Sequence, residues 1–271
     1  MTAPHRPDRD RAARPGLARL ALEQRIVYEV GAFAAASPVL RMLGRGDRHP
    51  VLVLPGFSAS DSSTLPLRNV IRSQGYWVHA WGLGRNIGPT EEIVTGLVDR
   101  LRLLSEQHDA KVSLIGWSLG GIYARAMARM FPEYVRDVIT LGSPYRLRDA
   151  SSTPISRLFR RYESRHMVTP ADRANMPAEQ DLAPLTMPAT SIYSRTDGIV
   201  HWSNCIDAEG PLRENIEVRS SHVGLGVSPA AIVAISDRLA RAQGDWKPFK
   251  PNAVVGGLFP KPVWWTPDAD R

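Results

Sequence analysis

The pentapeptide Gly-Trp-Ser-Leu-Gly, residues 116–120, restricts the fold of this chain more than any other feature. It follows a short apolar run, Val112 to Ile115, and precedes an Ala-rich stretch, Ile122 to Met130, with a helical pattern. Gly-x-Ser-x-Gly between a buried strand and a helix is typical of a nucleophile elbow, a turn so tight that the serine takes strained backbone angles. Side chains at the flanking positions would clash with the adjacent strand and helix, which explains the glycines. The pattern predicts that Ser118 projects above a sheet at a helix N-terminus; the alternative is an ordinary small-residue turn.

Further apolar runs alternate with helical patterns along the chain. The expected strands are Pro50–Leu54, Tyr76–Trp81, the run before the elbow, Val135–Gly142, Ala189–Ser194 and Ile216–Arg219. The expected helices are Leu17–Ala35, Leu65–Gln74, a helix opened by Thr90, the helix after the elbow, and one capped by Ser228 that runs to about Ala242. Because this alternation produces right-handed βαβ units, the sequence predicts an α/β fold with a doubly wound, mostly parallel sheet and helices on both faces.

The segment 145–188 interrupts this alternation. It is rich in Pro, Arg, Ser and Met, and short helices are expected over Pro154–Arg165 and from Pro170 to Asn175. We interpret the segment as a cap or lid inserted over the carboxyl ends of the strands; the alternative is a disordered surface loop. The resulting division is a disordered basic head over 1–19, an α/β core over 20–144 and 189–242, and a surface tail over 243–271 with Trp264 and Trp265 docked.

Composition excludes several function classes. The net charge is +7, but the chain has no helix-turn-helix, no Cys/His finger and no RNA-binding aromatic motif, so we expect no nucleic-acid partner. A single cysteine, Cys205, excludes an internal disulfide and a cysteine-based zinc site. Glu23, Arg25 and Glu29 interrupt the apolar stretch 21–40, which argues against a signal peptide and a transmembrane helix. We therefore expect a cytoplasmic protein whose first helix packs on the core, with weak membrane-surface contact as the alternative.

A serine hydroxyl becomes a nucleophile at neutral pH only when a base removes its proton, and the near-neutral pKa of histidine suits that role. A carboxylate then fixes the imidazole tautomer and stabilises the imidazolium. Ser118, Asp197 and His222 occur in the order serine, acid, histidine, after three different predicted strands. Of the seven histidines only His222 has this order and position. His201 is too close to Asp197 to come from a separate loop, and Asp207 is the alternative acid.

The tetrahedral intermediate of acyl transfer also needs N–H donors that form an oxyanion hole. One donor is expected from Leu119, the residue after the nucleophile. The second is expected from Phe57, in the loop after the first strand, where Gly56 lets a substrate approach the backbone; an ordinary Pro-Gly turn is the alternative. Large apolar side chains predict a substrate pocket around this point, unless they belong to the core: Phe57, Trp117, Trp202 and Leu225.

Six segments together resemble the α/β-hydrolase superfamily and, within it, bacterial lipases and carboxylesterases. They are residues 51–57 (Val-Leu-Val-Leu-Pro-Gly-Phe), 81–86, 116–121, 141–144, 193–200 and the pair Ser221-His222. The resemblance covers about Pro50 to Gly224 and implies Ser118, Asp197 and His222 as the catalytic triad, with Phe57 and Leu119 as backbone oxyanion donors. One departure is Pro55-Gly56, where many lipases have His-Gly, so the shape of the oxyanion hole differs from the usual pattern.

These observations predict a serine hydrolase that cleaves carboxylic esters through an acyl-enzyme and needs neither a metal nor another cofactor. The expected substrate is a small-molecule or lipid ester with an apolar part. An acyltransferase or thioesterase with the same triad is the alternative, followed by a non-catalytic binding protein on this fold. The motifs do not encode the acyl acceptor, the chain-length preference or the oligomeric state.

Overall fold

The computed structural model describes residues 17–44, 46–147, 153, 155–168, 172, 177 and 179–266. Its centre is a six-stranded sheet formed by β1 (Pro50–Leu54), β2 (Trp77–Ala80), β3 (Val112–Trp117), β4 (Val135–Leu141), β5 (Ala189–Tyr193) and β6 (Arg213–Glu217). The strand order is β2-β1-β3-β4-β5-β6, and every neighbouring pair is parallel. The strand order reverses between β1 and β3, and ligands of such sheets bind at the carboxyl ends beside that switch point.

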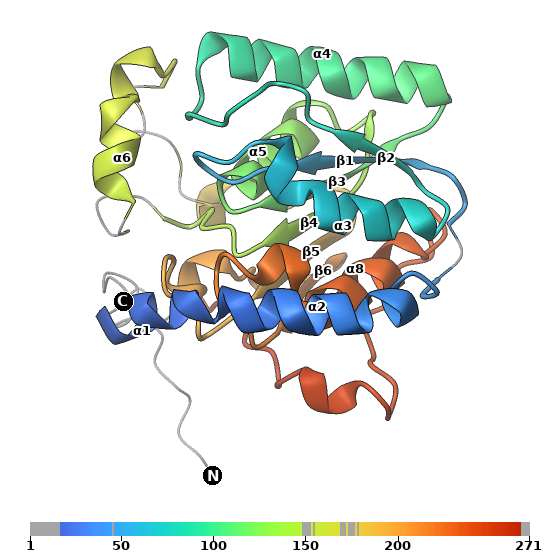
Figure 1. Ribbon diagram of the computed structural model, residues 1–271. Helices are drawn as coiled ribbons and strands as arrows, with labels where there is room; N and C mark the ends of the chain where they lie inside the picture. The colour runs from blue at the N-terminus through green and yellow to red at the C-terminus, as the bar shows by residue number, and fades with distance from the viewer. Residues whose placement is uncertain are drawn as a thin grey trace.

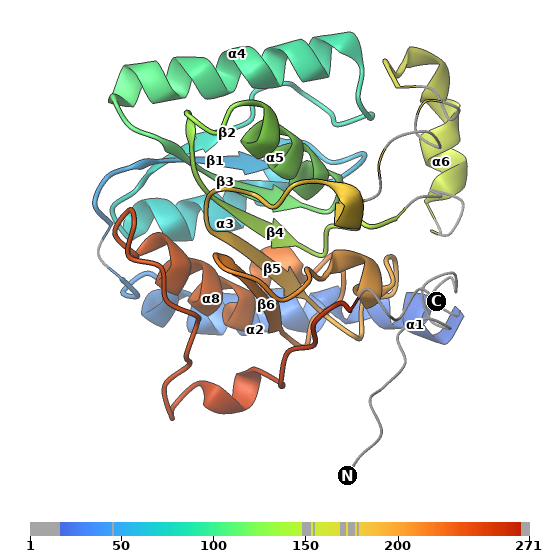
Figure 2. The same ribbon diagram turned by 180° about the vertical axis from the view of Figure 1, so that it is seen from behind.

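Helices cover both faces of the sheet (Figures 1 and 2). On one face lie α4 (Glu91–His108) and α5 (Leu119–Met130); on the other lie α3 (Asp61–Ser73) and α8 (Pro229–Leu239), with α2 (Ile26–Leu40) packed against α8. Strand β1 shows how one apolar strand supplies both cores, because successive side chains point to opposite faces. Val51 and Val53 join the core under α3 and α8, whereas Leu52 and Leu54 join the core under α4 and α5.

The predicted α/β fold is confirmed, although two elements begin earlier than expected. Helix α3 starts at Asp61 rather than Leu65, because the Asp61 carboxylate accepts hydrogen bonds from the N–H groups of Trp81 and Gly82 and so fixes the first turn. Strand β6 starts at Arg213 rather than Ile216. The apolar pattern did not predict the first half of this strand, because its buried residue Glu214 is polar and forms an ion pair with Arg238.

The N-terminal helix is also longer than predicted. It consists of α1 (Leu17–Ala21), a 3₁₀ turn (Leu22–Arg25) and α2, which continues to Leu40 rather than stopping at Ala35. Two predicted N-caps are confirmed: Thr90 Oγ1 accepts from the N–H of Ile93, and Ser228 Oγ accepts from the N–H of Ala231. Residues 1–16 of the predicted head lie outside the described residues.

Segment 145–188 contains α6 (Ser156–Arg161) and the 3₁₀ turns Glu163–Arg165 and Glu179–Asp181 within its described residues. Helix α6 stands beyond the carboxyl ends of the strands (Figure 1). The predicted helix from Pro170 to Asn175 lies outside the described residues, apart from position 172. Further 3₁₀ turns are Trp202–Cys205, Leu225–Val227 and Gly256–Leu258. In the tail, Trp265 is buried and its backbone N–H donates to the Asp207 carbonyl oxygen, so this tryptophan packs against the rest of the chain.

Candidate active site

The turn between β3 and α5 has the geometry that the glycine pattern predicts. Ser118 has φ of 53° and ψ of −120°, a left-handed conformation that costs free energy for a residue with a side chain. A Cβ atom added at Gly116 would overlap the backbone of Gly121, and one added at Gly120 would overlap the carbonyl oxygen of Leu54. The close packing of strand, turn and helix therefore requires both glycines, and it holds Ser118 at the start of α5.

Asp197 and His222 meet at the carboxyl edge of the sheet, in the loops after β5 and β6. Asp197 Oδ2 lies 2.6 Å from His222 Nδ1, and both side chains are almost fully buried. The other oxygen, Oδ1, accepts from the N–H groups of Ile199 and Val200 at 2.8 and 2.7 Å. These two bonds fix the carboxylate, so the imidazole is held with Nδ1 toward the acid and Nε2 away from it.

This pairing changes the titration of the histidine. Burial alone lowers the pKa of His222, because it disfavours the charged imidazolium. The negative charge of Asp197 and its hydrogen bond act in the opposite direction and prevail, with a smaller contribution from Glu23, so the pKa of His222 lies above its ordinary value of 6.5. The histidine is therefore a stronger base than a free imidazole.

The elbow and the histidine loop are joined directly. The indole N–H of Trp117 donates to the carbonyl oxygen of His222 at 3.1 Å, and the backbone N–H of Ser118 donates to the carbonyl oxygen of Leu141 at 2.8 Å. A Cβ atom on Gly142, which follows Leu141, would lie 3.2 Å from both Asp197 Oδ2 and His222 Nδ1. The ends of β3, β4, β5 and β6 thus converge. Among the described residues, no hydrogen bond joins Ser118 Oγ to His222, and such contacts often tighten only with bound substrate.

The alternative base and the alternative acid have other partners. His201 Nδ1 lies 2.9 Å from Ser203 Oγ, and its ring packs against Trp202. Asp207 forms an ion pair with the buried Arg125 at 2.9 Å. These contacts assign Asp207 to a structural ion pair and leave Asp197 as the acid beside His222.

The loop after β1, which carries the expected oxyanion donor Phe57, is held by Asn86. This asparagine is fully buried, and its side-chain amide donates to the carbonyl oxygen of Pro55 at 2.9 Å. Its backbone adds two bonds, to Ser58 at 2.6 Å and to Ala59 at 2.8 Å. Leu119, the other expected donor, is the first residue of α5, so its N–H has no acceptor within the helix. In the sequence Asn86 is only the last residue of the segment 81–86, and no local pattern predicts its hydrogen-bond partners.

A second serine–histidine–aspartate series lies at the opposite, amino end of the sheet. Ser113 Oγ is 2.8 Å from His49 Nε2, and His49 Nδ1 contacts the Asp47 carboxylate. Ser113 is fully buried, however, and its hydroxyl donates to Asp137 Oδ2 at 2.8 Å. Burial and the charge of Arg136 lower the pKa of His49. The Ser113 hydroxyl is therefore closed to a substrate. We interpret this series as a set of hydrogen bonds that stabilises the amino end of the sheet.

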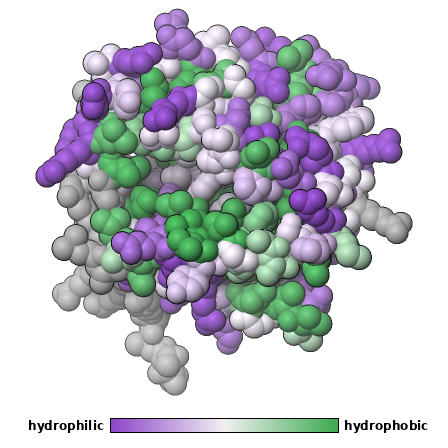
Figure 3. All heavy atoms as spheres, viewed as in Figure 1, coloured by the Kyte–Doolittle hydropathy of each residue, from purple (hydrophilic) through white to green (hydrophobic). Residues whose placement is uncertain are grey.

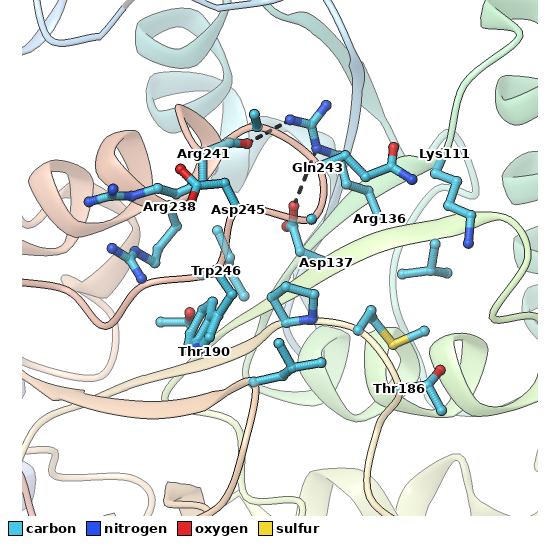
Figure 4. Close-up of a pocket in the computed structure, with 17 residues that line it drawn as sticks. Lys111, Arg136, Asp137, Thr186, Thr190, Arg238, Arg241, Gln243, Asp245 and Trp246 are labelled. Carbon is cyan, nitrogen blue, oxygen red and sulfur yellow. Dashed lines mark hydrogen bonds and ion pairs between the residues drawn. The ribbon is translucent and has the colours of Figure 1, made fainter.

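A cavity of about 350 Å³ lies at this amino end as well (Figure 4). Its walls include Lys111 before β3, Arg136 and Asp137 at the start of β4, Arg238 at the end of α8 and Arg241 just after it. The arginines are engaged with neighbours, because Arg238 pairs with Glu214 and Arg136 donates to the carbonyl oxygen of Arg241. The cavity is thus separated from Ser118 by the length of the strands, and it is not part of the candidate site.

Three of the four expected pocket residues, Trp117, Leu225 and Trp202, occupy different environments. Trp117 is partly buried beside the histidine loop. Leu225 is fully buried, and its side chain would touch a Cβ atom on Gly142, next to the Asp197–His222 pair. Trp202 is buried in a separate cluster with Tyr193 and Trp265. Contact with substrate stays a prediction for all three. In the described part of the chain no group of histidine, cysteine, aspartate and glutamate side chains could hold a metal ion, and no helix could span a membrane.

Comparison with solved structures agrees with this geometry. Lipase B of Aspergillus fumigatus aligns with 74% of this chain and 55% of its own, at 16% identity and a TM-score of 0.56. A structure from a study of LipS and LipT, two metagenome-derived lipolytic enzymes, aligns with 73% of this chain and 94% of its own, at 20% identity and a TM-score of 0.54. The chain has the α/β-hydrolase fold. In this fold the serine elbow and the two loops of Asp197 and His222 occupy one end of the sheet.

Sequence comparison points to the same fold over a shorter range. The human protein named serine hydrolase BPHL is 30% identical over 118 residues, which is 40% of this chain and 40% of that protein. The mouse protein of the same name is 28% identical over 110 residues. The match thus spans about two fifths of the length of these curated relatives. No protein-family model matches the chain.

Proposed function

We propose that this α/β-hydrolase-fold protein is a serine hydrolase that cleaves carboxylic esters with an apolar acyl or alcohol part. Ser118 Oγ attacks the ester carbonyl carbon while His222 takes the hydroxyl proton, and the N–H groups of Phe57 and Leu119 bind the developing oxyanion. His222 then gives the proton to the leaving alcohol, and the acyl group stays on Ser118. Water, deprotonated by His222, attacks the acyl carbon and releases the acid and free Ser118.

The observation that carries this proposal is the buried Asp197–His222 pair at the same end of the sheet as the strained Ser118. A strained serine, a base with a raised pKa and an N–H at a helix N-terminus are the groups that acyl transfer requires. The names of the similar proteins, a serine hydrolase, a lipase and lipolytic enzymes, support the same reaction class.

We also propose that segment 145–188 forms the cap of this site and selects its substrate. The ring of Phe159 in α6 packs against the ring of Phe57 with centroids 5.1 Å apart, and Tyr162 packs against the same ring at 6.3 Å. His166 Nε2 lies 2.8 Å from the carbonyl oxygen of Ile87, beside the loop that Asn86 holds. These ring contacts with Phe57, the expected oxyanion donor, support a cap with an apolar wall that would exclude water from the bound ester.

Hydrolysis of p-nitrophenyl esters with acyl chains of increasing length tests this function. The wild-type protein is expected to release p-nitrophenol, whereas Ser118→Ala is expected to lose at least about a thousandfold in kcat/KM. Partition of the acyl group between water and added alcohol or thiol then separates a hydrolase from an acyltransferase. A folded wild-type protein without hydrolysis or acyl transfer on any of these esters would contradict the proposal.

We also propose that the outer face of α2 makes a weak contact with an anionic lipid bilayer. Between Ile26 and Leu40 the only charged residue is Glu29, which turns inward, and several apolar side chains face solvent, among them Val27 and Tyr28 at 75% and 82% exposure. Figure 3 shows hydrophobic (green) surface in the region where α2 crosses the front of the molecule. Arg41 lies exposed directly after α2, and the chain as a whole carries a net charge of +7. Such a face binds the headgroup boundary of a negatively charged membrane.

Co-sedimentation with vesicles tests this contact. Binding is expected to vesicles that contain phosphatidylglycerol and to weaken with phosphatidylcholine alone, and the double variant Val27→Asp/Tyr28→Asp is expected to lose it. The matched control is Leu103→Asp, an exposed leucine on α4. If wild type and double variant sediment equally, or if the double variant instead changes the oligomeric state, α2 does not contact lipid.

A further inference from the structure

The helical segment before β1 reaches the carboxyl edge of the sheet, where the candidate triad lies. In both views α1 stands at the same end of the molecule as α6 (Figures 1 and 2). The resemblance to known hydrolases begins only near Pro50, so this segment is not part of it. Its polar side chains nevertheless contact the two loops that carry Asp197 and His222.

Glu23, in the 3₁₀ turn between α1 and α2, binds both loops with one carboxylate. Oε1 accepts from the N–H of Gly198 at 2.7 Å, directly after the acid, and from the N–H of His222 at 2.9 Å. Oε2 accepts from the N–H of Val223 at 3.0 Å. Three backbone donors from two loops thus converge on one side chain. Charge-assisted bonds of this kind are stronger than neutral ones, and they fix the separation of the loops.

Two neighbouring side chains repeat this arrangement. Glu29 accepts from the N–H of Ser221 at 2.6 Å and also from the Ser221 hydroxyl. Arg25 donates to the carbonyl oxygen and the hydroxyl of Thr196 at 2.9 and 2.7 Å, and it lies 3.6 Å from Glu29. The segment therefore contacts the residue before the acid, the residue after it, and the three residues centred on the histidine.

The loops are shaped to receive this segment. A Cβ atom on Gly198 would overlap the carbonyl oxygen of Arg19, and one on Gly224 would overlap the carboxylate of Glu29. Neither glycine has a positive φ, so conformational freedom does not explain them. The close approach of the N-terminal segment explains both glycines, because only a residue without a side chain leaves room for that segment at positions 198 and 224.

We propose that residues 19–29 form a strap that holds the acid loop and the histidine loop of the active site together, with Glu23 as its positioning residue. This inference rests on the proposed function, because Asp197 and His222 are the groups it positions. Glu23 binds backbone N–H groups of the two loops rather than the imidazole itself. It acts by setting where the His222 backbone lies relative to Asp197, and by placing a negative charge behind the histidine.

The charge has a separate, measurable consequence. The charged groups that face the histidine loop are Asp197 on the imidazole, Glu23 and Glu29 on the backbone, and Arg25 beside Glu29. Glu23 favours the imidazolium and adds to the effect of Asp197 on the pKa of His222. Removing its charge is therefore expected to lower that pKa, whereas a side chain that only supports packing would change stability alone.

The test compares Glu23→Gln, which keeps the size and removes the charge, with Glu23→Asp, which keeps the charge and shortens the reach. Gln24→Ala, an exposed neighbour, is the matched control. Gly198→Ala displaces the strap without altering any charge. NMR titration of the histidine ring protons, with His222 identified by its absence in His222→Ala, measures the pKa without any need for turnover. Ester hydrolysis measures kcat, KM and the pH profile.

We expect Glu23→Gln to lower the pKa of His222, with the acid limb of kcat/KM moving to lower pH by the same amount. Glu23→Gln, Glu23→Asp and Gly198→Ala are each expected to lose about ten- to a hundredfold in kcat with KM little changed, because the triad loops separate. Glu23→Asp should keep the pKa near the wild-type value, and Gln24→Ala should behave as wild type.

Wild-type kcat and an unchanged His222 pKa in folded Glu23→Gln would overturn the strap, as would a lower melting temperature with no change in kcat or pKa. A wild-type protein that hydrolyses no ester would instead refute the proposed function. In that case the NMR titration still decides whether Glu23 acts on His222.

Discussion

The indole N–H of Trp117 donates to the backbone carbonyl oxygen of His222 at 3.1 Å, which ties the residue before the nucleophile to the loop of the base. Trp117→Phe keeps an aromatic ring at this position and removes the donor. Loss of one such bond costs about 1 kcal/mol, so we expect a three- to tenfold decrease in kcat on p-nitrophenyl esters. If Trp117→Phe has wild-type kcat at every acyl length, the bond does not position the histidine.

Asp197 and Asp207 provide a comparison between two buried carboxylates. Asp197→Asn is expected to reduce kcat/KM by about 10³- to 10⁴-fold with little change in melting temperature, because the amide favours the wrong tautomer of His222. Asp207→Asn removes one partner of the buried Arg125, so we expect it to lower the free energy of unfolding by about 2–3 kcal/mol while kcat changes little. Urea denaturation and ester hydrolysis of both variants check this. If Asp207→Asn loses activity and Asp197→Asn loses only stability, Asp207 is the catalytic acid.

The raised pKa of His222 predicts opposite pH trends for activity and stability. Since only the neutral imidazole accepts a proton, kcat/KM is expected to rise through a midpoint above 6.5. Because the folded-state pKa exceeds the unfolded-state value, protonated His222 stabilises the fold; this contribution is complete below the unfolded-state pKa and is lost as the pH rises through the folded-state pKa. The free energy of unfolding of wild type relative to His222→Gln, measured in urea, should therefore be larger near pH 5.5 than near pH 8.5. A difference that grows toward high pH contradicts the assignment.

The cap is tested most simply at Phe159. Phe159→Ala removes the ring that packs against Phe57, and we expect it to alter KM and the preferred acyl length while Ser118 keeps its reactivity toward a small phosphonate. Leu158→Ala, an exposed residue of the same helix, is the control. An identical acyl-length profile for both variants and wild type would show that α6 does not select the substrate.

The sheet, the elbow and the positions of Ser118, Asp197 and His222 were predictable because their signals are local. An apolar run, two glycines and the order of strands specify Ser118 at the switch-point edge without knowledge of distant contacts. The same locality made Val112–Trp117 and Pro50–Leu54 easy to assign, because strands buried on both faces are continuously apolar.

The strap was not predictable from these patterns. Glu23 and Glu29 were visible as charges in an apolar stretch, but their partners are backbone N–H groups, which no side-chain pattern marks. Those partners lie 175 to 200 residues further along the chain. The sequence likewise gives no reason to distinguish Gly198 and Gly224 from ordinary loop glycines, because the groups that exclude a Cβ atom there come from the distant N-terminal segment.

The central claim is that Ser118, rather than another serine beside a histidine, is the nucleophile. Ser113 is the matched control, because its hydroxyl lies 2.8 Å from His49 Nε2 in the second serine–histidine–aspartate series. Wild type, Ser118→Ala and Ser113→Ala would be treated with a fluorophosphonate, and the modified peptide identified by mass spectrometry. The account predicts one label on Ser118 in wild type and Ser113→Ala, and none in Ser118→Ala. A label on any other residue, or one that persists in folded Ser118→Ala, would contradict it.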